Sequence, residues 1–224
     1  MFLHTFHPQP VLFQLGNIKV YWYGIFIAIG ILAAFKISEW MLRKYKYKFS
    51  RDDSFFENID ILDLTIYLLA GGLIGARLFY VLSEWRYFIL KPLDIFKVWN
   101  GGLWIYGAIF GGFSALFIWK KIKNKNFFLK FFLDLIAPGI IFAQAIGRWG
   151  NYFNQELYGL PTKLSWGIPV DIISRVSGFQ TFEYFHPTFL YESLWCAVVG
   201  IFLIGLHFYR IKKMPANTEI KNIA

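Results

Sequence analysis

Five long apolar segments constrain this chain more than any other feature of its sequence. They occupy Val20–Met41, Ile59–Leu82, Leu103–Trp119, Phe127–Gly147 and Phe189–Tyr209. Each is long enough to cross a bilayer core of about 30 Å as a helix. Because 57% of the residues are hydrophobic and only 17% are charged, the chain carries more apolar surface than one soluble core needs. The sequence predicts an all-α, polytopic integral membrane protein with about five transmembrane helices in a single domain, residues 1–224.

The distribution of basic residues indicates how these helices are oriented. Lys and Arg concentrate in the segments after the first, third and fifth apolar runs. Cytoplasmic loops are enriched in these residues, so we predict an outside N-terminus and a cytoplasmic C-terminus. The longest connection, residues 160–187, then forms a small extracytoplasmic cap. Because the basic residues lie between spans, the net charge of +9 fits an anionic lipid surface rather than nucleic acid.

A polar motif at the end of the fourth apolar run is the strongest functional signal. It reads G-R-W-G-N-Y-F-N-Q-E-L-Y-G from Gly147 to Gly159. A helix continued through it at about 100° per residue would gather several polar members on one narrow face. These are Arg148, Asn151, Gln155 and Gly159, with Glu156 just outside. A guanidinium there, at headgroup depth, can hold a phosphate through two parallel hydrogen bonds. The alternative is that Arg148 and Glu156 pair with each other or anchor the helix end in water.

Other polar residues near the membrane have competing interpretations. Arg77 lies inside the second apolar run and must find water, a carboxylate or a lipid phosphate. Tyr23 fits an aromatic belt at the outer end of the first run. His186, Tyr191 and Glu192 place a ring, a phenol and a carboxylate before the fifth run, where interface anchoring competes with a general base. The sequence shows no metal-ligand cluster, so we expect no metal site.

Glycines, acids and one proline predict local packing. The glycines of the second and third runs recur at small-xxx-small spacings, which favours close helix packing. They are Gly71, Gly72, Gly75, Gly101, Gly102, Gly107, Gly111 and Gly112. Asp60 and Asp63 fit the capped first turn of the second helix. Asp134 lies four residues before Pro138, where a kink can free backbone groups.

Several sequence blocks resemble those of bacterial prolipoprotein diacylglyceryl transferases, which are polytopic enzymes of the cytoplasmic membrane. The Gly147–Gly159 motif resembles the signature of that family, and further blocks follow in the family's order. They are Y-W-Y-G (Tyr21–Gly24), G-A-R-L-F-Y-V-L (Gly75–Leu82), W-N-G-G-L (Trp99–Leu103), D-L-I-A-P-G (Asp134–Gly139) and H-P-T-F-L-Y-E (His186–Glu192). Together the blocks cover nearly the whole chain.

The resemblance implies a transferase that forms a thioether at the outer face of the bacterial cytoplasmic membrane. The family transfers the diacylglyceryl group of phosphatidylglycerol to the lipobox cysteine of a preprolipoprotein and releases glycerol 1-phosphate. The implied partners are phosphatidylglycerol, the preprolipoprotein lipobox and the bilayer. No cofactor is implied, and no nucleic acid.

The resemblance also assigns residues to the site. Arg148 matches the family's phosphatidylglycerol-binding arginine, while Asn151 and Glu156 match its essential amide and acid, so all three are expected to be catalytic. Arg148 and Asn151 are also expected to bind the lipid headgroup. Three further positions, Gly159, Tyr23 and Arg77, complete the expected phosphatidylglycerol site.

Two departures from the family pattern leave alternatives open. Tyr106 stands where most members have a histidine, and a phenol with a pKa of about 10 is a poor base at neutral pH. The family continues for two more spans, whereas this sequence ends in a basic tail, 210–224, so we expect a shortened chain. One alternative is a member that binds lipid without turnover or needs a partner. A channel or transporter is a second alternative, against which the clustering of polar residues near one face argues.

Overall fold

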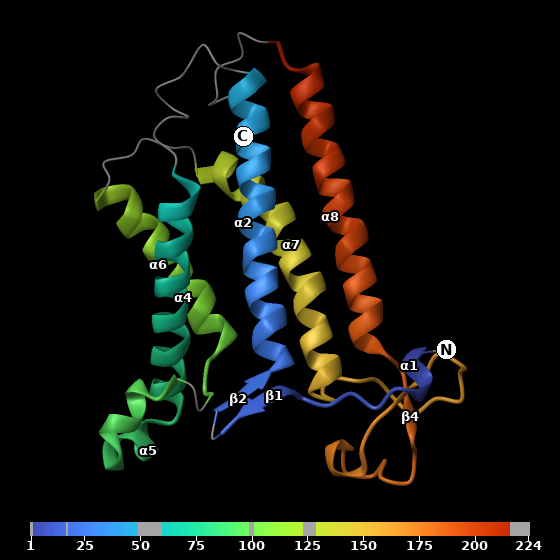
Figure 1. Ribbon diagram of the computed structural model, residues 1–224. Helices are drawn as coiled ribbons and strands as arrows, with labels where there is room; N and C mark the ends of the chain where they lie inside the picture. Colours follow the sequence, from blue (N-terminus) through green and yellow to red (C-terminus); the bar gives the residue numbers. More distant parts are fainter. Residues whose placement is uncertain (1, 17, 49–59, 99–100, 123–128, 216–224) are drawn as a thin grey trace. The chain divides into compact units, whose positions relative to one another are not determined.

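The computed structural model describes residues 2–16, 18–48, 60–98, 101–122 and 129–215 (Figure 1). The chain divides into two compact units. Unit 1 comprises residues 1–49 and 130–224, and unit 2 comprises residues 50–129. A single domain over residues 1–224 stays a prediction. Trp99 and Asn100, from the W-N-G-G-L block, lie outside the described residues, as does most of the basic tail.

Five helices in the described residues are long and apolar enough to cross a membrane. They are α2 (Trp22–Lys48), α4 (Ile61–Ser83), α6 (Ile105–Ile122), α7 (Leu129–Phe153) and α8 (Thr188–Lys213). Each overlaps one of the five apolar runs, so the predicted polytopic helical fold is confirmed. The orientation of the helices in the membrane stays a prediction.

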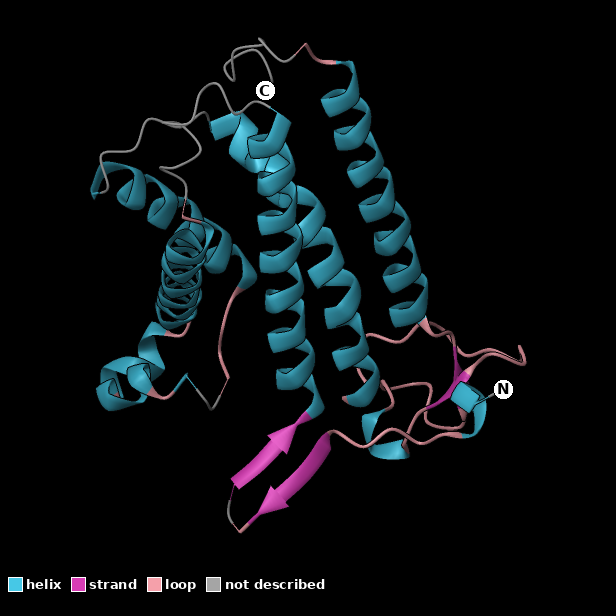
Figure 2. Cartoon of the chain, turned by 45° about the horizontal axis from the view of Figure 1, so that its top comes forward, coloured by secondary structure: helices cyan, strands magenta, loops and turns pink. Residues whose placement is uncertain are grey.

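Unit 1 also contains short elements at the end of its helices where the cap lies. These are α1 (Phe2–Thr5), β1 (Val11–Leu15), β2 (Ile18–Tyr21), β3 (Ile168–Pro169), η4 (Ile172–Ser174) and β4 (Tyr184–Phe185). β1 pairs antiparallel with β2, and β3 pairs antiparallel with β4. The β1–β2 hairpin leads directly into α2 (Figure 2). These strand pairs were not predicted.

Helices α2, α7 and α8 lie side by side in unit 1 (Figures 1 and 2). α2 and α8 begin at the end of the bundle where α7 finishes, so the polar motif lies beside both starts. Aromatic rings hold this end together: Trp22 stacks on Phe153 at 4.7 Å between centroids, and Tyr152 stacks on Phe189 at 4.6 Å. The buried Tyr152 and Phe189 form a small core with Ile168 of the cap.

A buried polar bridge connects the same three helices at their opposite end. The hydroxyl of Tyr45 on α2 lies 2.6 Å from Nδ1 of His207 on α8, and His207 Nε2 lies 3.1 Å from the carbonyl oxygen of Asp134 on α7. That carbonyl lacks its usual helical donor because Pro138, four residues later, has no N–H. The Asp134 carbonyl is thus a backbone group freed by Pro138, as predicted, whereas the kink itself stays a prediction. The Asp134 carboxylate pairs with Arg210 of α8 at 3.2 Å.

In unit 2, α4 and α6 pack through glycines. A Cβ built on Gly75 would overlap the carbonyl oxygen of Gly107 and lie 2.8 Å from Cα of Gly111, and Gly71 faces Gly111 and Ala115 as closely. Close packing is confirmed for these glycines, whereas Gly72 makes only ordinary contact at 3.6 Å. Gly102 lies before α6 with φ of 74°, and it also packs closely on α4, because an added Cβ would overlap the ring of Tyr80. The prediction of close packing is wrong for Gly112 and Gly101, where an added Cβ would meet open space, and Gly101 has a φ of 84°.

The acids at the start of α4 are only partly explained by capping. Asp60 accepts hydrogen bonds from the backbone N–H groups of Leu62 and Asp63, at 2.9 and 3.1 Å, so it caps the helix as predicted. Asp63 has a different function, because its carboxylate accepts a 2.6 Å hydrogen bond from the indole of Trp119 on α6. After α4, the chain forms α5 (Trp85–Leu90) and η2 (Pro92–Phe96).

Candidate functional site

The polar motif does not continue as a helix. α7 ends at Phe153, and both Gln155 and Leu157 have a φ of 52°, in the left-handed region that reverses the chain. Arg148 and Asn151 do share one face of α7. Gln155 and Gly159 do not join that face, so the expected helical grouping of these two residues is wrong. The hypothesis extended a 3.6-residue period across residues that form a turn.

Arg148 forms its ion pair with α8. Its Nη2 lies 2.6 Å from Oε2 of Glu192, and its Nη1 makes a long contact of 3.4 Å with Oδ1 of Asn151. Its remaining N–H groups have no partner among the residues that the structure describes. The alternative in which Arg148 pairs with Glu156 is wrong, since the carboxylate comes from Glu192. The Arg148 side chain is 25% exposed, so a ligand can reach it.

Asn151 links Arg148 to Glu156. The buried Asn151 amide donates to Oε1 of Glu156 at 2.7 Å, and Asn154 donates to the same oxygen at 3.3 Å. The reversal of the chain after Phe153 brings Glu156 back to α7, and the N–H of Glu156 donates to the Asn151 carbonyl at 3.0 Å. The three residues predicted to be catalytic therefore form one continuous chain of contacts.

Tyr23 reaches the same region from α2. Its ring packs against Gly150, where an added Cβ would lie 2.7 Å from Tyr23 Cδ2. Gly150 lies between Arg148 and Asn151 on α7. Because Gly150 has no side chain, the phenol of Tyr23 can approach α7 closely at this point of the motif. The Tyr23 side chain is exposed, and its hydroxyl has no hydrogen bond within the described ranges.

Gly159 makes room for the protein itself. Its N–H donates to the carbonyl of His186 at 2.9 Å, and an added Cβ would lie 2.8 Å from the Cβ of His186. Beyond it, Nδ1 of His186 lies 3.1 Å from the Tyr191 hydroxyl, which also accepts a 2.9 Å hydrogen bond from the indole of Trp166. The close approach at Gly159 thus fixes the start of α8, from which Glu192 extends.

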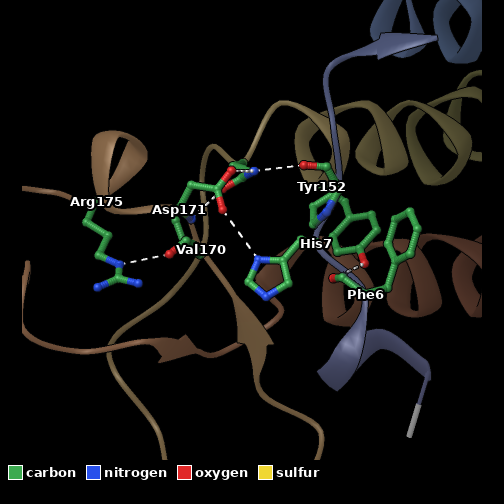
Figure 3. Close-up of polar contacts among 8 residues, drawn as sticks. Phe6, His7, Tyr152, Val170, Asp171 and Arg175 are labelled. Atoms are coloured by element: carbon green, nitrogen blue, oxygen red, sulfur yellow. Dashed lines mark hydrogen bonds and ion pairs between the residues drawn. The ribbon is translucent and has the colours of Figure 1, made fainter.

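Gln155 fastens the N-terminal segment to the cap. Its Nε2 donates to the Pro8 carbonyl at 2.8 Å and to the Asp171 carboxylate at 2.7 Å, while its Oε1 accepts from the Asp171 N–H at 2.6 Å. Figure 3 shows His7 approaching the same carboxylate, at 3.4 Å. Arg175 binds the cap backbone nearby. Gln155 therefore holds the N-terminal segment against the cap, and it makes no hydrogen bond to Arg148 among the described residues.

Arg77 is in unit 2 and is fully engaged by its own chain. It is buried, and its guanidinium lies 5.5 and 5.3 Å from the rings of Tyr80 and Phe88. Its N–H groups donate to the carbonyls of Ile95, Gly101, Gly102, Asp94 and Lys97, at 2.8, 2.7, 3.1, 2.5 and 3.4 Å. An arginine has five N–H donors, so none is left for a phosphate. Substrate binding by Arg77 stays a prediction, and these contacts do not favour it.

The segment that Arg77 holds carries the pKa shifts of unit 2. Lys97 pairs with the Asp94 carboxylate at 2.6 Å, and the Tyr87 hydroxyl donates to it at 2.6 Å. These two hydrogen bonds hold the pKa of Asp94 below its ordinary range, and the bond to Asp94 raises the pKa of Tyr87. Tyr87 is exposed, and the Asp94 side chain is 22% exposed. The ion pair and the hydrogen bond both connect η2 to its neighbouring residues.

Glu192 is the site residue that the sequence analysis missed. Its interpretation as part of an interface anchor overlooked that Arg148 needs a carboxylate at the same membrane depth. Tyr106, which replaces the family histidine, is in unit 2 with its ring exposed. Among the described residues, no three His, Cys, Asp or Glu side chains gather as metal ligands. The site is a partly exposed guanidinium with unused donors beside a buried amide and an acid, which suits a phosphate monoanion.

Comparisons with known proteins identify the family of this chain. The family model described as prolipoprotein diacylglyceryl transferase matches residues 10–221. A protein of Trichormus variabilis, named phosphatidylglycerol-prolipoprotein diacylglyceryl transferase, is 41% identical over 96% of this chain and 72% of its own length. Proteins of the same name from Synechocystis and Fervidobacterium nodosum are 37% and 42% identical, over 92% and 87% of this chain and 69% and 63% of theirs. The chain therefore belongs to the prolipoprotein diacylglyceryl transferase family.

Proposed function

We propose that this chain transfers the diacylglyceryl group of phosphatidylglycerol to the lipobox cysteine thiol of a preprolipoprotein and releases glycerol 1-phosphate. Family membership supports the reaction class. The observation that carries the assignment to a site is Arg148, whose guanidinium is partly exposed at the end of α7 and has N–H groups without partners among the described residues. A guanidinium matches a phosphate in shape and charge.

The reaction needs a nucleophile and a stabilised leaving group. The thiol loses its proton, because the thiolate is the nucleophile. Its sulfur attacks the diacylglycerol carbon that bears the phosphate, and the carbon–oxygen bond breaks as the carbon–sulfur bond forms. The phosphate keeps the electron pair, and Arg148 stabilises the negative charge that develops there. Glu156, or water beside Arg148, takes the thiol proton in this scheme.

The neighbours of Arg148 orient it and the headgroup. Asn151 contacts both Arg148 and Glu156, so it can hold the guanidinium in position and offer hydrogen bonds to the glycerol hydroxyls. Tyr23 places a phenol beside this group from α2. Gly159 contributes by allowing α8 to start close to the motif. Both substrates carry their own membrane anchors, so alignment at the interface supplies much of the rate.

The site is expected to lie at the outer face of the bacterial cytoplasmic membrane. The positive-inside rule places the start of α2 and α8 and the end of α7 on the outer side. Phosphatidylglycerol in the outer leaflet and a translocated lipobox would then meet at Arg148. A member that binds lipid without turnover has the same geometry and is separated from the transferase only by an activity measurement.

The test uses the protein in phosphatidylglycerol proteoliposomes with a lipobox peptide, and follows glycerol phosphate release. Arg148→Lys keeps the charge and loses the forked contact, so we expect release to fall by about 10²-fold, the usual cost of one lost transition-state donor. Arg43→Lys is the matched control, because Arg43 is exposed toward the other end of α2 and, among the described residues, pairs with Glu39 alone. Equal turnover in Arg148→Lys and the control would refute the phosphate contact, and no release by the unsubstituted protein would favour binding without turnover.

A further inference from the structure

Glu192 makes one polar contact among the described residues, the ion pair with Arg148. Its carboxylate oxygen lies 2.6 Å from Nη2, and 47% of its side chain is exposed. The pair therefore lies at the surface of the α7–α8 junction, where solvent or a ligand can reach both groups. The carboxylate binds the same guanidinium that the proposed function assigns to the lipid phosphate.

A carboxylate and a phosphate compete for one guanidinium. Both are anions whose oxygens accept the parallel N–H groups of arginine. The phosphodiester of phosphatidylglycerol carries one negative charge, as Glu192 does, so exchange of one for the other conserves charge at Arg148. Glu192 contacts Nη2 and Asn151 makes a long contact with Nη1, so within the described ranges the remaining N–H donors of Arg148 are open for an arriving phosphate to begin the exchange.

The α7–α8 junction does not depend on this ion pair. Ser193, the residue after Glu192, is buried and donates a 2.8 Å hydrogen bond to the Ala145 carbonyl of α7. The rings of Trp149 and Phe189 meet at 5.3 Å on the neighbouring turn. Because these contacts hold the helices together, the Glu192 side chain can leave Arg148 without separating them.

We propose that Glu192 is an exchangeable counter-anion, which neutralises Arg148 in the empty site, yields to the lipid phosphate and returns as glycerol 1-phosphate leaves. This inference rests on the proposed function. Glu192 is then a positioning residue that sets affinity for substrate and product. A partly exposed ion pair changes an equilibrium constant by up to about fivefold, which is weak enough for a lipid at membrane concentration to displace it.

Return of Glu192 matters most for the product. Glycerol 1-phosphate is a phosphate monoester and carries close to two negative charges at neutral pH, so Arg148 holds it more strongly than the diester substrate. A carboxylate tethered beside the guanidinium has a high effective concentration. Whenever the product moves away from Arg148, the Glu192 carboxylate can therefore bind the guanidinium in its place. Removing the carboxylate should therefore strengthen binding of both ligands and slow product release.

The experiment compares Glu192→Gln with the unsubstituted protein in two measurements. One is native mass spectrometry of dioleoyl phosphatidylglycerol adducts, with phosphatidylcholine as the reference lipid. The other is the inhibition constant of glycerol 1-phosphate in the release assay. We expect the dissociation constant of the lipid and the inhibition constant of glycerol 1-phosphate both to fall about two- to fivefold in Glu192→Gln. Glu183→Gln is the matched control, because the side chain of Glu183 lies exposed in the cap away from Arg148, and it should change neither constant.

A structural role for Glu192 predicts the opposite result. If Glu192 only anchors Arg148, both constants rise or stay unchanged in Glu192→Gln, and the inference is overturned. Glu192→Ala removes the residual amide contact and should shift the constants in the same direction as Gln; a loss of folding in either variant would also overturn the proposal. Lipid binding is measured without turnover. A protein that does not catalyse the proposed transfer can therefore be distinguished from a protein in which Glu192 does not exchange with the lipid phosphate.

Discussion

Replacement of His207 by phenylalanine tests the buried bridge of unit 1. Because a carbonyl only accepts, Nε2 of His207 carries the proton donated to Asp134, and Nδ1 of the neutral ring accepts from Tyr45. His207→Phe removes both bonds. A hydrogen bond between membrane helices contributes about 0.6 kcal/mol on average, and a buried carbonyl left without a donor costs about 1–3 kcal/mol. We expect a loss of about 2 kcal/mol in the free energy of unfolding.

The cause of this loss can be isolated with Pro138. Pro138→Ala restores the N–H that the Asp134 carbonyl lacks, so the helix satisfies this carbonyl without His207. In that background His207→Phe should cost only the Tyr45 bond, about 0.6 kcal/mol. Equilibrium unfolding in mixed detergent and dodecyl sulfate micelles, followed by circular dichroism, measures the four proteins of the cycle. If His207→Phe costs the same with and without the Pro138→Ala substitution, the reasoning is refuted.

Two further predictions concern unit 2. Gly75→Ala places a Cβ against the Gly107 carbonyl and should destabilise the protein by about 1–3 kcal/mol. The control is Gly72→Ala, whose nearest contact lies at 3.6 Å. Thermal melts should show that the control is as stable as the unsubstituted protein or more stable. Arg77→Lys retains at most three donors and should speed proteolysis near residues 94–98 without changing phosphatidylglycerol affinity; a tenfold loss of affinity with unchanged proteolysis would instead establish the substrate contact.

The helices could be predicted from sequence because hydrocarbon thickness sets the length of each apolar run. All five spans were located without knowledge of tertiary contacts. The end of α7 could not be located in this way. Nothing in the apolar pattern distinguishes one more helical turn from the reversal at Gln155. The side chain of Gln155 binds Pro8, 147 residues away in the sequence, and Asp171 in the cap, and these contacts hold the reversal in place.

The site was predictable where its members are close in sequence. Arg148 and Asn151 are one helical turn apart, and their contact follows from the helical period. The Arg148 pair with Glu192 joins helices separated by the whole cap, and a single sequence does not reveal which carboxylate faces which arginine. The partner of Arg77 could not be predicted for the same reason. The sequence around an arginine inside an apolar run is the same whether its partner is a lipid phosphate or a set of backbone carbonyls.

The discontinuity of unit 1 has a consequence for synthesis of the protein. Residues 1–49 and 130–224 belong to one compact unit, with unit 2 inserted between them. A ribosome adds about 5–20 residues per second, so α2 leaves it about 4–16 seconds before α7 begins. During that interval Tyr45 and Trp22 have none of the partners on α7 and α8 that surround them later. α2 must wait in the membrane, shielded by lipid or by the insertion machinery, until the second half of its unit arrives.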